Sequence, residues 1–76
     1  LEMIWQNIGR ILKVASMTED NIVHVRSFLT DRSHADSNAR YRMQALRGRP
    51  VAVTSVIVNT LDPTWLVEIE VMAVDG

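Results

Sequence analysis

The C-terminal third of the chain holds two runs of mostly β-branched residues, at positions 51–58 and 66–74. Residues of this kind favour strands, and the connector between the runs contains Asp62 and Pro63, which are typical of a turn. The pattern therefore predicts two strands, and we expect them to lie side by side. Both faces of the first run are apolar or small, which predicts a strand that is covered on both sides.

The second run alternates more clearly, and its two sides predict different surroundings. One side is apolar throughout, as expected for a core face. The other side carries Glu68 and Glu70 among apolar neighbours. A closed core would not tolerate two unpaired carboxylates, and a solvated face would contain more polar residues. We therefore predict that this face meets another subunit, with the glutamates near a pocket or seam.

Apolar residues recur at helical spacing near the N-terminus and predict a helix over residues 2–16. Gly9 interrupts this helix at a cost of up to about 1 kcal/mol relative to alanine, so we expect it to mark close packing against a strand. Residues 22–30 then alternate, which predicts a further strand with His24 and Arg26 on its less apolar face. The expected core stripe of the helix consists of Ile4, Ile8, Ile11, Leu12 and Ala15.

A second helix is predicted over residues 35–47, where the apolar stripe is weaker. We expect Asp36 or Ser37 to cap its start and Gly48 to stop it. The resulting order, α-β-α-β-β, predicts a single α+β domain over residues 1–76, in which the helices cover one face of a mixed sheet.

The composition indicates whether this domain assembles with other subunits and where it resides in the cell. With 76 residues and a hydrophobic content of 47%, the chain is short for the apolar surface it carries, which favours assembly with other subunits. No apolar run approaches the roughly 20 residues of a membrane helix. The chain has no cysteine and a net charge of −1, and together these features predict a cytoplasmic protein that does not bind membranes. It opens with Leu1 inside a predicted helix, so we expect that preceding sequence is missing.

Few side chains have the spacing expected of a catalytic, metal-binding or ligand-binding site. His24 and His34 lack a metal-ligand spacing, and no phosphate-binding or nucleophile motif occurs, so neither a metal nor a cofactor is expected. Arginines gather around the second helix and leave open a contact with nucleic acid. The slightly negative net charge and the scarcity of aromatic residues argue against it and favour a solvated helix face. These arginines are Arg40, Arg42, Arg47 and Arg49.

Beyond these patterns, the sequence resembles the YjgF/RidA family of imine and enamine deaminases, formerly called endoribonuclease L-PSP. The resemblance runs in unbroken order through residues 7–17, 25–31, 38–41, 49–56 and 66–74. It implies a chorismate-mutase-like α+β sandwich, here truncated at the N-terminus because the family's β-hairpin region before the first helix is absent. That absence would leave a sheet edge unpaired. The resemblance also implies a homotrimer that binds a small-molecule ligand in clefts between subunits.

The resemblance assigns candidate site residues as well. Asn38, Ser55 and Glu68 match cleft positions of the family, and Glu68 stands where the catalytic glutamate orients water or substrate. We expect Asn38 and Ser55 to contact substrate together with position 53. The family motif Pro-Ala-Arg-Ser/Thr, however, reads Val-Ala-Val-Thr at residues 51–54. Val53 therefore replaces the arginine that grips the substrate carboxylate, and a valine cannot make those bonds.

Two main functions remain open at this point. The first is a hydrolase that converts 2-imino acids to keto acids and ammonia, impaired because Val53 replaces the motif arginine. The second is a non-catalytic small-molecule-binding or regulatory trimer, with apolar clefts lined by Val53, Ser55 and Glu68. An RNA-binding role through the arginines near the second helix and an inactive fragment are the remaining alternatives.

Overall fold

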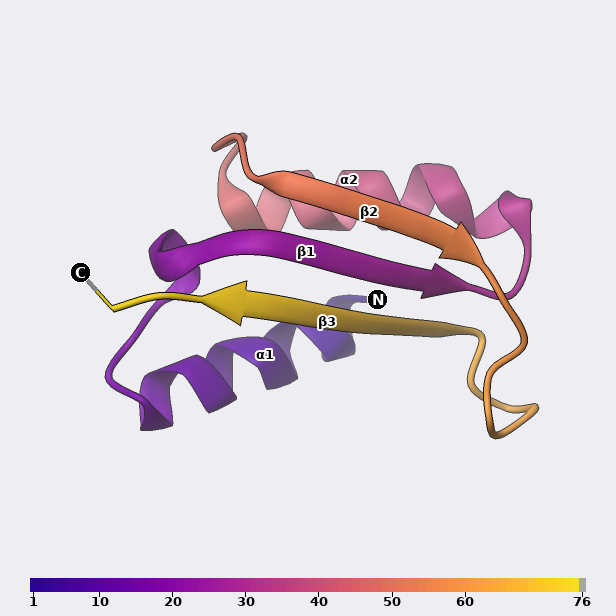
Figure 1. Ribbon diagram of the computed structural model, residues 1–76, viewed down its shortest axis with the longest axis horizontal. Helices are drawn as coiled ribbons and strands as arrows, with labels where there is room; N and C mark the ends of the chain where they lie inside the picture. Colours follow the sequence, from indigo (N-terminus) through magenta and orange to yellow (C-terminus); the bar gives the residue numbers. More distant parts are fainter. Residues whose placement is uncertain (76) are drawn as a thin grey trace.

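The computed structural model describes residues 1–75 and places two helices on one face of a three-stranded sheet (Figure 1). In Figure 1 the sheet faces the viewer and both helices lie behind it, α2 on the β2 side and α1 on the β3 side. The predicted α+β class and the order α-β-α-β-β are confirmed. The elements are α1 (Glu2–Val14), β1 (Ile22–Leu29), α2 (Ala35–Leu46), β2 (Ala52–Ile57) and β3 (Val67–Ala73), with 3₁₀ turns η1 (Glu19–Asn21) and η2 (Arg32–His34).

β1 occupies the centre of the sheet, with β2 parallel to it on one side and β3 antiparallel to it on the other. The prediction that the two C-terminal strands lie side by side is therefore wrong. The crossover through α2 returns the chain to begin β2 parallel to β1, and β3 pairs with the remaining edge of β1. The connector crosses between the two outer strands, and the Val58 N–H still donates to the Leu29 carbonyl (2.8 Å) as the connector begins.

The core lies between the helices and the sheet. The predicted stripe on α1 is right at Ile8 and Leu12, and Ile4 packs against the core. It is wrong at Ile11, which is 70% exposed, and at Ala15, which is exposed just beyond the end of the helix. Trp5 takes the place of Ile11, because residues 5, 8 and 12 lie on one face of a helix. The core cluster comprises Trp5, Ile8, Leu12, Ile22, Val25 and Leu46.

The outer strands differ in their exposure. Along β3, partly buried and exposed residues alternate, and in the single chain Glu68 and Glu70 are exposed on the face away from the helices. That another subunit covers this face stays a prediction. Every residue of β2 is exposed, so the prediction of a strand covered on both sides is wrong for the single chain. The reason is position: β2 has a hydrogen-bonded neighbour on one edge alone, and apolar composition cannot by itself supply cover.

The start of α2 uses a different cap from the one predicted. The Asp31 carboxylate accepts a hydrogen bond from the Ser33 N–H (2.8 Å) and so starts η2, which runs directly into α2. This backbone bond, followed by the Ser33 hydroxyl, lowers the pKa of Asp31. Neither Asp36 nor Ser37 caps the helix, because both already lie within its first turn. At the other end α2 stops one residue earlier than predicted: Arg47 (φ 55°) is the left-handed cap, and Gly48 (φ 71°) continues the left-handed backbone.

Gly9 is closely packed, although not against a strand. A Cβ atom at this position would lie 3.0 Å from the Glu19 carboxylate oxygen Oε1. Glu19 belongs to η1, so the missing side chain of Gly9 makes room for an acidic side chain between α1 and the turn before β1.

Within residues 1–75, neither helix is long and apolar enough to cross a bilayer. The same residues contain no group of three or more histidine, aspartate or glutamate side chains placed to hold a metal ion. The cytoplasmic location expected from the sequence stays a prediction.

Candidate functional site

Val53 and Ser55 lie on the helix-facing side of the edge strand β2. Their register partners on β1 are Val25 and Ser27, which are fully buried beneath the helices, and paired residues share a face of the sheet. Val53 itself is 43% exposed, since β2 is an edge strand with a hydrogen-bonded neighbour on one side alone. It lines a hollow of about 190 Å³ together with Arg42, Met43, Leu46, Gly48, Arg49, Pro50 and Val51.

Asn38 is buried between α2 and β1. It is 2% exposed, and its side-chain oxygen accepts a hydrogen bond from the Ser27 hydroxyl (3.4 Å). Ser27 in turn is the register partner of Ser55. The structure therefore brings Asn38 close to the predicted substrate-binding side of β2, where it helps to hold α2 on the sheet through a satisfied polar contact in the core.

Glu68 lies on the opposite face of the sheet from Val53 and Ser55. It is paired with Phe28 of β1 and is exposed on the face that no helix covers. Its neighbour Glu70 forms an exposed ion pair with Arg26 (3.3 Å). Glu68 lines a separate hollow of about 290 Å³ with Phe28, Val58, Asn59, Thr60 and Leu61. Within one chain the four predicted site residues thus fall into two groups, divided by the sheet.

The hollow beside Val53 contains two arginines that differ in how they are held. The Arg49 guanidinium donates from Nη2 to the carbonyls of Glu19 (2.7 Å) and Ile22 (2.9 Å) and so fixes the entry to β1. Arg42 is partly buried and has no ion pair within residues 1–75. Among the described residues, Arg42 is therefore the guanidinium of this hollow without an ion pair or hydrogen bond, but it belongs to α2 and does not occupy position 53 of β2.

Sequence reasoning grouped Arg42 with the other arginines of the second helix and missed its position. The signal was present, because residue 42 follows Asn38 by one helical turn and lies on the same face of α2. Two of the four arginines are already engaged: Arg40 lies over the Tyr41 ring (5.9 Å to the centroid), and Arg49 donates to backbone carbonyls. A nucleic-acid contact through these arginines stays a prediction.

The chain matches the family model described as Endoribonuclease L-PSP over residues 1–75. Yeast Mmf1 has a similar structure, with a TM-score of 0.85 and 29% identity over 95% of this chain and 58% of that one. RidA from the Antarctic bacterium Psychrobacter gives 0.84 and 27% identity over 92% of this chain and 57% of that one. None of the curated proteins matches significantly.

A Thermotoga maritima protein provisionally described as an endoribonuclease shares the fold with a TM-score of 0.90, at 23% identity over 99% of this chain. This chain covers 59% of the Thermotoga protein. It therefore spans less than two thirds of the length of each of these solved relatives.

Proposed function

This chain belongs to the endoribonuclease L-PSP family, also known as the YjgF/RidA family, and on that premise we propose that it binds a small uncharged molecule beside β2 and hydrolyses 2-imino acids poorly. The observation that carries the proposal is Val53. It is 43% exposed at the mouth of a hollow, at the position where the resemblance places the carboxylate-binding arginine. The surface it offers there is apolar.

The chemistry explains why this one side chain matters. In the deaminase reaction, water adds to the carbon of a C=N bond, and the adduct breaks down to a carbonyl compound and ammonia. Glu68 would orient the water or carry a proton, while a cation holds the substrate carboxylate in place. Without a bidentate arginine, each lost charge-assisted hydrogen bond costs about 1.5–3 kcal/mol of binding. Binding of an uncharged ligand does not carry this cost.

An assembly of several chains would place the helix-facing side of β2 from one chain and the uncovered sheet face of a neighbour around the same ligand. Val53 and Glu68 lie on opposite faces of the same sheet, so one chain alone cannot place both against one ligand. A cleft between subunits can, because Val53 from one chain and Glu68 from a neighbour would then meet. We therefore include in the proposal a homotrimer in which the uncovered sheet face packs against its copies.

We expect the unmodified chain to distinguish an amide from a carboxylate of the same shape. Isobutyramide should raise the thermal midpoint more than isobutyrate at equal concentration and ionic strength, because the carboxylate must lose water and position 53 of β2 supplies no bidentate partner. Arg42 lines the same hollow from α2, so R42Q should abolish any residual stabilisation by isobutyrate. In parallel, ammonia release from freshly generated 2-iminopropanoate should exceed the uncatalysed rate by less than about tenfold. Equal stabilisation by the two ligands, or acceleration by several orders of magnitude, would contradict the proposal.

The assembly has its own test. The uncovered sheet face exposes Val56 and Met72, at 38% and 58% of their areas, and burying such residues between copies would drive association. We expect sedimentation velocity to give about three times the chain mass of 8.6 kDa, and V56D to yield monomers. V14D, on the outer face of α1 where Val14 is 89% exposed, is the matched control and should remain trimeric. A monomeric unmodified chain at micromolar concentration would end the trimer proposal.

A further inference from the structure

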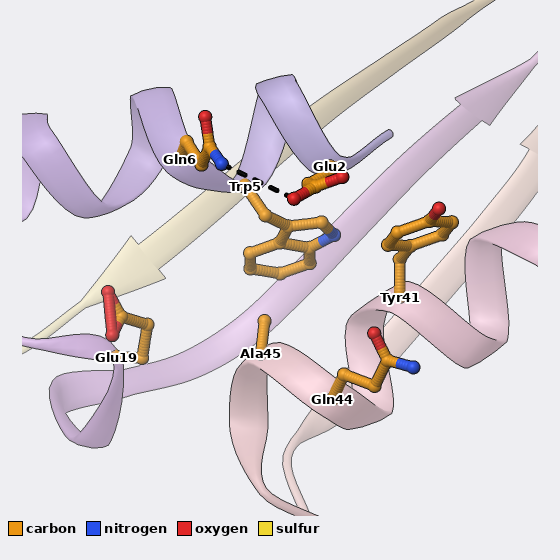
Figure 2. Close-up of a pocket in the computed structure, with 7 residues that line it drawn as sticks. All are labelled: Glu2, Trp5, Gln6, Glu19, Tyr41, Gln44 and Ala45. Atoms are coloured by element: carbon orange, nitrogen blue, oxygen red, sulfur yellow. Dashed lines mark hydrogen bonds between the residues drawn. The ribbon is translucent and has the colours of Figure 1, made fainter.

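A groove runs between α1 and α2, and seven side chains from the two helices and η1 line it (Figure 2). Its volume is about 530 Å³, which is enough for a small organic molecule. The lining residues are Glu2, Trp5, Gln6, Glu19, Tyr41, Gln44 and Ala45. They combine two carboxylates, two aromatic rings and two amides, and no lysine or arginine is among them.

The two carboxylates are only weakly engaged by the chain itself. Glu2 accepts a single long hydrogen bond from the Gln6 amide (3.5 Å). The Glu19 side chain is partly buried and forms no hydrogen bond or ion pair within the described part of the chain. It sits against Gly9, where a Cβ would come within 3.0 Å of it. The nearby Arg49 guanidinium donates to the Glu19 backbone carbonyl (2.7 Å) and forms no ion pair with the Glu19 carboxylate. A partly buried carboxylate without an ion-pair partner is costly, so the groove favours a positively charged occupant.

The indole of Trp5 provides an independent sign of a ligand. Trp5 is 7% exposed, and its Nε1–H is buried without a hydrogen-bond acceptor. Buried indole N–H groups usually have a partner. In Figure 2 the ring lies between the two helices, and its nitrogen edge points toward Tyr41 on the side of Glu2. The unsatisfied donor is thus aimed into the groove between a carboxylate and an aromatic ring.

We propose that this groove binds a small organic ammonium ion that also carries a hydroxyl oxygen. The ammonium would lie against the Trp5 ring and against the face of Tyr41 opposite to the one that Arg40 covers, because aromatic faces attract cations. Glu2 and Glu19 would supply the opposite charge. The hydroxyl oxygen would accept the indole N–H, which is buried and becomes accessible once side chains lining the groove shift. The groove lies apart from Val53 and Glu68, so this inference does not rest on the proposed function.

The probe is choline, and the control ligand is its uncharged isostere 3,3-dimethyl-1-butanol. Two indole N–H signals are expected in a ¹H–¹⁵N spectrum of the whole chain, and a W65F variant assigns the signal of Trp5. We expect choline to shift the Trp5 signal downfield with saturation at constant ionic strength, and the neutral alcohol to bind at least about tenfold more weakly. Equal shifts with both molecules, or no saturable shift, would overturn the proposal.

A pair of matched variants tests whether the Glu19 carboxylate recognises the ammonium ion. E19Q removes one carboxylate of the groove while keeping its shape, and it should weaken choline binding by about fivefold or more. D20N removes the adjacent carboxylate, which does not line the groove, and should leave binding unchanged. Circular dichroism of both variants confirms that they are folded. If E19Q and D20N bind choline equally well, the groove does not recognise the cation through Glu19 and the inference fails.

Discussion

Replacing Val53 with arginine should raise the affinity of this chain for 2-oxo and 2-imino acids by at least about 100-fold. Two charge-assisted hydrogen bonds to a carboxylate contribute about 1.5–3 kcal/mol each, and each 1.4 kcal/mol corresponds to about tenfold in affinity. Because Val53 is 43% exposed at the mouth of its hollow, a longer side chain can extend outward without displacing core residues. Calorimetric titration with pyruvate measures the gain, and ammonia release from 2-iminopropanoate measures any accompanying turnover.

Controls separate the planar guanidinium from its charge and its bulk. V53K adds a charge without the bidentate fork and should recover only part of the gain, while V53L adds bulk alone and should recover none. R42Q tests whether Arg42, which lines the same hollow, accounts for weak pyruvate binding by the unmodified chain. A folded V53R variant with no improvement in pyruvate binding would show that position 53 does not limit carboxylate recognition.

Truncating Ile22 to alanine should destabilise the chain by about 2–5 kcal/mol, the usual range for a large core residue. Ile22 is fully buried at the start of β1, where the pairing with β3 is irregular, and its carbonyl accepts one of the Arg49 hydrogen bonds. Small domains have total stabilities of about 5–15 kcal/mol, so the loss takes a large share. The thermal midpoint should fall by about 10 °C or more.

The neighbouring Val23 provides the matched control. It is 40% exposed, and V23A should cost less than about 1 kcal/mol, since mainly strand preference is lost. Both variants are compared by urea unfolding followed by circular dichroism at one protein concentration, because assembly makes apparent stability depend on concentration. Equal losses for I22A and V23A would mean that the core is not centred on Ile22.

Periodicity along the chain predicted most of the fold. It located both helices and all three strands within a few residues, and it separated the core side of β3 from the side that carries Glu68 and Glu70. These features are local: a side chain's direction follows from its place in a repeating backbone. Two predictions about these elements were wrong, and in both the correct residue lies only a few positions away in the sequence. Trp5 and not Ile11 faces the core, and Asp31 and not Asp36 organises the start of α2.

The candidate site was predictable to a lesser degree. Residue spacing along β2 correctly placed Val53 and Ser55 on one side of that strand, and the resemblance pointed to Asn38 and Glu68. Spacing carries no information on how strands are ordered, so it could not reveal that Glu68 lies across the sheet from Val53. Nor could it show that Asn38 is engaged with Ser27 in the core.

The amino-acid order alone was enough to specify the α+β class, the identity of each element and the replacement of a charged group by Val53, because each of these depends on residues close together in the chain. Folding in three dimensions settled the rest: β1 lies between β2 and β3, β2 is left exposed at an edge, and Glu19 lies against Gly9 beside the unsatisfied indole of Trp5. Those outcomes depend on which segments, distant in the sequence, pair with or pack against the same strand or helix. That competition is decided by the total surface buried and the hydrogen bonds satisfied across the whole molecule.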